Sequence, residues 1–153
     1  MHIETKQTLN IENLITFRKK VQATELQEHM ERLLAYADSS GAKRLGGGVS
    51  ATYEVDGDAM DIEMYLPIDK EIPSNDEFIF KPLLRLENCV KTKYKGHPQG
   101  LQNSMNEIND YILANRLVPI SVGFTVVVTE ITDPKDIELF EADIYVSIGP
   151  NVF

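Results

Sequence analysis

Apolar residues recur along the first half of the chain with two different periods. Over residues 14–21 they alternate with polar residues, which predicts a half-buried strand. The next apolar positions lie three or four residues apart, as on one side of an amphipathic helix; they are Leu26, Met30, Leu33, Leu34 and Ala37. We expect this helix to end at Ser39-Ser40-Gly41, because glycine can adopt the left-handed conformation that closes a helix.

A hairpin is predicted after this helix and a short glycine-rich segment. Residues 49–55 and 61–68 both alternate, and Asp56-Gly57-Asp58 stands between them. An Asp-Gly pair between two alternating runs is a strong short-range hairpin signal. The order predicted for the first half is therefore strand–helix–strand–strand.

The second half predicts the same elements in the same order. A strand is expected at 88–95, a helix after Pro98, and a hairpin formed by 122–131 and 142–148. Single residues also recur at a spacing of about 75 positions: Glu12-Asn13 returns as Glu87-Asn88, Leu26-Gln27 as Leu101-Gln102, and Tyr36 as Tyr111. We interpret the chain as two copies of one unit.

These elements predict a single α+β domain over residues 1–153. It would be a tandem pseudo-twofold repeat, with repeat 1 at about 11–68, a charged connector at 69–80 and repeat 2 at about 86–148. We expect a mainly antiparallel sheet with both helices on one face. A ligand cleft is expected between the repeats, because ligand sites often form where two halves of a protein meet.

The composition describes an acidic protein with one cysteine. A formal net charge of -9 would repel nucleic acids and anionic membranes, so we expect neither as a partner. Cys89 stands alone, and no segment is apolar enough for a signal sequence or a membrane span, so a cytoplasmic protein is expected. The three histidines are dispersed without the spacing of metal ligands, and no metal or cofactor is expected.

An acid stands two residues before a tyrosine in the last strand of each predicted hairpin. Glu63 and Tyr65 share one face of the first such strand, and Asp143 and Tyr145 share one face of the second. One interpretation is a concave site in which aromatic rings and carboxylates bind an organic cation. The other is a solvated sheet face where tyrosines cover the strands.

Three motifs of the second half follow one another in an order that resembles a known family. They are the strand end Tyr94-Lys95-Gly96-His97-Pro98, the strand and hairpin loop from Val126 to Asp133-Pro134, and the closing strand Asp143-Ile144-Tyr145-Val146-Ser147-Ile148. The first half matches the last motif with Glu63-Met64-Tyr65-Leu66-Pro67-Ile68. This set resembles the GyrI-like, or effector-binding, domains, a family that includes ligand-sensing halves of multidrug-responsive transcription regulators. The resemblance covers nearly the whole chain.

The resemblance implies a ligand cleft along a pseudo-twofold axis, with an acidic residue on a central strand among aromatic side chains. Glu130 is the acid of the matching strand here, and it shares a predicted face with Phe124. The family's aromatic residue after the turn is replaced by Gln99-Gly100. The residues expected to bind ligand are Tyr65, Tyr145, Glu63, Asp143, Glu130, Tyr53 and Phe124.

Three functions remain open on this basis. The first is a stand-alone protein that binds an apolar or cationic small molecule in the cleft. The second is a protein-interaction module, such as an inhibitor, immunity or adaptor protein, that uses the same sheet face. The third is a small-molecule hydrolase in which Glu63, Glu130 or Asp143 acts as a general base after burial raises its pKa. Binding is favoured over catalysis, and no catalytic residue is assigned.

Overall fold

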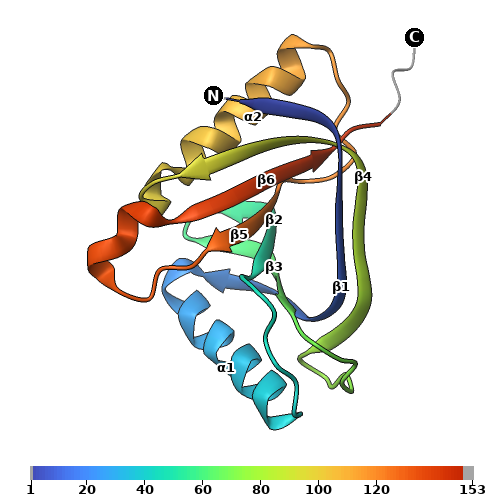
Figure 1. Cartoon of the computed structure of the whole chain (residues 1–153), viewed down its shortest axis with the longest axis vertical. Coiled ribbons are helices and arrows are strands. Elements are labelled where there is room, and N and C mark those ends of the chain that lie inside the picture. Colours follow the sequence, from blue (N-terminus) through green and yellow to red (C-terminus); the bar gives the residue numbers. More distant parts are fainter. Residues whose placement is uncertain (1, 150–153) are drawn as a thin grey trace. The chain divides into compact units, whose positions relative to one another are not determined.

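The computed structural model describes residues 2–149 and confirms the α+β class (Figure 1). The strands are β1 (Ile3–Gln22), β2 (Val49–Asp56), β3 (Ala59–Pro67), β4 (Ile79–Lys95), β5 (Phe124–Thr129) and β6 (Glu141–Ser147). The α-helices are α1 (Leu26–Ser39) and α2 (Leu101–Ala114), and short 3-10 helices span Ala23–Glu25, Pro98–Gly100 and Pro134–Leu139. β3 pairs antiparallel with β1 and β2, and β6 pairs antiparallel with β4 and β5.

The chain divides into two compact units, and the divisions fall inside β1 and β4. The first unit is Asn10–Leu84, and the second unit contains the described residues up to Leu9 together with those from Arg85 onward. Each unit has one α-helix and one hairpin. The pseudo-twofold relation of the repeats and their boundaries stay predictions.

The core of the first unit forms between α1 and the strands. Alternation along β3 turns Met64 and Leu66 to the side on which Leu33 and Ala37 of α1 are buried, and Phe17 of β1 joins them. Removing these apolar side chains from water is the main favourable contribution to packing the helix on the sheet. The acid–tyrosine positions of β3 therefore point to the other side.

The second unit has a core of the same kind under α2. Ile108 and Ile112 of α2 pack with Val90 of β4 and with Ile144 and Val146 of β6. The alternation in β6 is the same as in β3, so Asp143 and Tyr145 occupy the face opposite to these apolar residues.

Local backbone geometry recurs at equivalent positions of the two units. Gly41 after α1 has a φ of 79°, and Arg116 after α2 has a φ of 54°. In both cases the next residue closes the helix, with Ala42 N donating to Ala37 O and Leu117 N donating to Ile112 O, each at 3.0 Å. The predicted end of α1 at Gly41 agrees with this geometry.

Two strands are longer than the alternating pattern predicts. β1 begins at Ile3 rather than near residue 14, and β4 begins at Ile79 rather than at residue 88. The predicted connector therefore ends inside β4. In the second hairpin the strand expected at 122–131 is shortened to β5, and the loop contains a 3-10 helix.

No helix within residues 2–149 is long and apolar enough to cross a membrane. The cytoplasmic location expected from the sequence stays a prediction.

Candidate functional site

Glu63 of β3 is a buried carboxylate with three hydrogen-bond donors. Its side chain is 8% exposed. Tyr65 donates its hydroxyl to Glu63 Oε1 at 2.6 Å, and Tyr53 donates to the same oxygen at 3.1 Å. Lys81 Nζ donates to Glu63 Oε2 at 2.7 Å. Both carboxylate oxygens are thus satisfied, which is what a buried charge requires.

The β2–β3 hairpin brings these side chains together. Glu63 and Tyr65 lie two residues apart on β3, so alternation puts them on one face. Tyr53 lies on β2 at a register shift between Thr52 and Glu54. It is the extra residue of a β-bulge, a feature that re-aims a side chain relative to the regular ladder.

The hydrogen bonds keep Glu63 ionised and Tyr65 protonated. Burial raises the pKa of Glu63, but the hydrogen bonds from Lys81 and Tyr65 outweigh burial, and the pKa lies below its usual value. Burial and the hydrogen bond to Glu63 raise the pKa of Tyr65 far above its usual value. The condition for Glu63 as a general base, a pKa raised by burial, is therefore not met.

Each tyrosine of this cluster also has a cation against its ring. Lys81 Nζ lies 5.2 Å from the ring centroid of Tyr65, and Arg18 Cζ lies 3.8 Å from the ring centroid of Tyr53. Asp61 orients Arg18 through two hydrogen bonds, from Nε at 3.1 Å and from Nη2 at 2.9 Å. The carboxylate and the two rings therefore form a surface that contacts cations within the chain itself.

The second unit contains a related trio of acid, tyrosine and lysine. Lys91 of β4 is opposite Tyr145 of β6 in the strand register. Lys91 Nζ lies 3.6 Å from Asp143 Oδ2 and 5.2 Å from the ring centroid of Tyr145. Burial lowers the pKa of Lys91, but its interactions with Tyr145 and Asp143 outweigh this, and the pKa is raised. The Asp143 side chain is 17% exposed against 8% for Glu63, whereas Lys91 is 15% exposed against 39% for Lys81.

The two remaining predicted site residues have different placements. Phe124 is buried and pairs with Tyr145 across β5 and β6. Glu130 lies beyond the end of β5 at Thr129 and is exposed. The expectation that Glu130 lies in the strand on the face of Phe124 is wrong, because the register shifts before Thr129 and the strand ends there.

The structure thus groups the predicted residues by unit, with Tyr53, Glu63 and Tyr65 in the first and with the others in the second. Burial of Glu63 and Tyr65 argues against a solvated sheet face at these positions. The sequence interpretation missed the lysines. Lys91 could have been found from its position across from Tyr145 in a paired hairpin strand, whereas Lys81 gave no signal because its segment was not expected to be a strand.

No family model matches the sequence, and no curated protein matches it. Solved structures share the fold. The C-terminal domain of EcmrR superposes with a TM-score of 0.75 and 12% identity, covering 99% of this chain and 100% of that one. EcmrR in its DNA complex gives a TM-score of 0.74 with 13% identity over 95% of this chain, which spans 57% of the length of that EcmrR chain.

Two further structures have the same fold with different ligands or activities. A hydrolase from Listeria innocua gives a TM-score of 0.59 and 14% identity, covering 94% of this chain and 92% of that one. SAV2435, bound to tetraphenylphosphonium, gives a TM-score of 0.52 and 13% identity, covering 97% and 93%. At these identities the likeness concerns the fold. The resemblance to effector-binding domains inferred from the sequence is therefore confirmed for the fold.

Proposed function

Because the chain has the fold of an EcmrR-type C-terminal domain, we propose that it binds a small organic cation through the Tyr53–Glu63–Tyr65 cluster. The observation that carries this proposal is the buried Glu63 carboxylate, which has an aromatic ring and a cation held against it. SAV2435 supports the choice of ligand class, since a protein of the same fold is bound to an organic cation.

Lys81 makes the contacts that an organic cation would make. Its ammonium group pairs with Glu63 at 2.7 Å and lies 5.2 Å from the Tyr65 ring. The Lys81 side chain is 39% exposed. Because lysine has a flexible four-carbon stem, its ammonium group can move out into solvent. An unpaired buried carboxylate is strongly destabilising, so a ligand that displaces Lys81 has to carry a positive charge itself. The site would therefore discriminate against neutral molecules of the same shape.

The ligand contacts expected from Asp143, Tyr145 and Phe124, and the expected cleft between the repeats, stay predictions from the sequence. The proposal rests on residues of the first unit alone. A hydrolase of this fold is known from Listeria innocua. For Glu63, however, the lowered pKa and the occupied oxygens favour binding over general-base catalysis.

Thermal unfolding with tetraphenylphosphonium tests this proposal. Ligand at about 100 times its Kd stabilises the folded state by about 2.7 kcal/mol, which raises the Tm of a protein of this length by about 5–11 °C. In Glu63→Gln, which removes the charge and keeps the shape, we expect no rise. The matched control is Glu87→Gln, because Glu87 pairs with Arg85 on the surface and is 68% exposed.

Triphenylphosphine oxide is the neutral aromatic probe for the same assay, and we expect it to leave the Tm unchanged. A full response of Glu63→Gln to tetraphenylphosphonium would contradict the assignment of the site to Glu63. If the cation leaves the Tm of the wild type unchanged, the ligand class is contradicted, and a protein-interaction module becomes the favoured function.

A further inference from the structure

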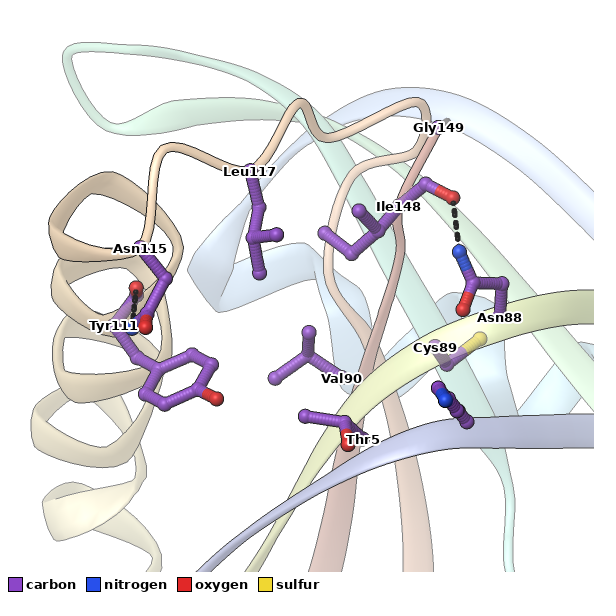
Figure 2. A pocket seen from close by; sticks show the side chains of 10 residues that line it. Thr5, Asn88, Cys89, Val90, Tyr111, Asn115, Leu117, Ile148 and Gly149 are labelled. Carbon is purple, nitrogen blue, oxygen red and sulfur yellow. Dashed lines mark hydrogen bonds between the residues drawn. The ribbon is translucent and has the colours of Figure 1, made fainter. Parts of the chain in front are cut away.

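A pocket of about 350 Å³ lies within the second unit and involves none of the seven predicted ligand-binding residues. Figure 2 shows it between the C-terminal part of α2, β4 and the beginning of β1. Its volume is in the range of small-molecule sites. The lining residues are Thr5, Lys6, Asn88, Cys89, Val90, Tyr111, Asn115, Leu117, Ile148 and Gly149.

One wall of this pocket is apolar and belongs to the core of the second unit. Val90 and Ile148 are buried core residues, and Tyr111 and Leu117 pack against the same core. Figure 2 shows these four side chains directed into the space between α2 and the strands. Val90 and Ile148 are already buried, so an apolar ligand would chiefly remove the partly exposed side chains of Tyr111 and Leu117 from water, at a gain of about 25 cal/mol per Å².

Polar groups with fixed positions surround the apolar wall. The Asn115 amide donates to Tyr111 O at 2.8 Å, and the Asn88 amide donates to Ile148 O at 3.0 Å (Figure 2). The two asparagines are thus held by the backbone before any ligand arrives. A pocket whose polar groups are already positioned loses less conformational entropy on binding.

Lys6 is the single charged residue of the lining. Among residues 2–149 no carboxylate forms an ion pair with it, and no partner hydrogen-bonds to the Tyr111 hydroxyl. The pocket therefore offers one ammonium group and one hydroxyl donor beside an apolar wall. Those two groups match a carboxylate, which accepts hydrogen bonds and carries the opposite charge.

We propose that this pocket is a second binding site, separate from the Glu63 cluster, and that it takes a small apolar carboxylate. The tail lies against Val90, Leu117, Ile148 and the ring of Tyr111, and the carboxylate lies at Lys6 and the Tyr111 hydroxyl. The overall negative charge of the protein does not prevent this, because charges beyond about 8 Å are largely screened at physiological ionic strength. This pocket would therefore select negatively charged ligands, whereas the Glu63 cluster would select positively charged ones.

An NMR titration of the ¹⁵N-labelled full chain with octanoate tests the proposal. We expect saturable shifts at the backbone amides of the lining residues and at the side-chain amides of Asn88 and Asn115. The probes 1-octanol and octylammonium have the same tail with no charge and with a positive charge. Both should bind at least tenfold more weakly than octanoate.

Variants identify the groups that contact the carboxylate. Lys6→Gln should weaken octanoate binding about tenfold and leave 1-octanol binding unchanged, and Tyr111→Phe should weaken octanoate binding by a smaller factor. Lys19→Gln, at an exposed lysine outside the pocket, is the control and should bind octanoate as the wild type does. Glu63→Gln should also bind it normally, which separates this site from the organic-cation site.

Four results would overturn the proposal, three of which concern octanoate itself. They are the absence of saturable shifts with octanoate, shifts that map outside the lining residues, and wild-type octanoate affinity in Lys6→Gln. Equal binding of octylammonium would also overturn it, because the tail alone would then account for the affinity.

Discussion

Replacing Lys81 with methionine removes the counterion of Glu63 while keeping an unbranched side chain. Losing one partner of a fully buried ion pair costs about 3–5 kcal/mol, whereas an exposed pair contributes only about 0–1 kcal/mol. The Glu63 side chain is 8% exposed and the Lys81 side chain is 39% exposed, so this pair lies between the two cases. We expect Lys81→Met to lower the free energy of unfolding by about 2 kcal/mol at pH 7.

The loss should depend on pH in a defined direction. The folded-state pKa of Glu63 lies below its usual value, so in the wild type this group contributes stability above the unfolded-state pKa of about 4.3. That contribution disappears as the pH falls through the folded-state pKa. In Lys81→Met only the tyrosine hydrogen bonds oppose burial, so the pKa of Glu63 rises. The difference between the two proteins should be full at pH 7 and smaller at pH 4, because Glu63 of Lys81→Met takes up its proton at a higher pH than Glu63 of the wild type does.

Urea unfolding of both proteins at pH 7 and pH 4 measures this difference. Lys20→Met is the matched control, since Lys20 pairs with Asp56 at 3.4 Å and both side chains are more than half exposed. It should change the free energy of unfolding by less than about 0.5 kcal/mol. Equal losses for Lys81→Met at the two pH values would refute the argument, because the loss would then come from packing. A loss no larger than that of the control would show that Glu63 needs no counterion.

Two further substitutions test the local geometry by urea unfolding. Gly100→Ala should lower the free energy of unfolding by about 1–3 kcal/mol, because the added Cβ would overlap the hydroxyl oxygen of Tyr94. Adding Tyr94→Leu to this variant should recover part of the loss. If Gly100→Ala alone leaves the free energy of unfolding unchanged, the contact with Tyr94 is contradicted. Arg116→Gly should gain about 1 kcal/mol, because Arg116 has a φ of 54° and glycine adopts this conformation without strain. Arg116→Ala is the control and should not raise the free energy of unfolding. If Arg116→Gly is less stable than the wild type, the Arg116 side chain stabilises the fold by more than its backbone strain destabilises it.

The elements predicted correctly are those with local signals. Gly57 has a φ of 61° in the tight turn between β2 and β3, as the Asp-Gly pair indicated. Gly41 ends α1 with a φ of 79°. In both cases a few neighbouring residues determine the conformation, so the sequence pattern suffices.

The missed strand ends have partners that are distant in the sequence. Thr92 donates its hydroxyl to the carbonyl of His2, 90 residues away, and Thr16 donates to the carbonyl of Ile79, 63 residues away. Segment 3–10 is rich in polar residues, and segment 79–87 contains several apolar residues that do not alternate regularly with polar ones. Their extended conformation comes from tertiary pairing, which local periodicity does not reveal.

The candidate site was also predicted only where the signal is local. Alternation was enough to predict that Glu63 and Tyr65 share a face. It could not predict that this face is buried, because burial depends on which other elements cover it. Lys81 was missed because its segment was not predicted to be a strand, and Glu130 was placed in β5 because a β-bulge breaks the alternation that the prediction assumed.

The position of the unit boundaries inside β1 and β4 has a consequence for synthesis on the ribosome. The second unit needs residues up to Leu9 and also those from Arg85 onward, so its first strand segment emerges long before its partners exist. Closing a loop of this length costs about 4 kcal/mol in chain entropy before any contact is made. The nascent chain therefore carries an unpaired strand segment until the residues from Arg85 onward have emerged. A chaperone that shields extended segments would act on this protein at residues 3–9.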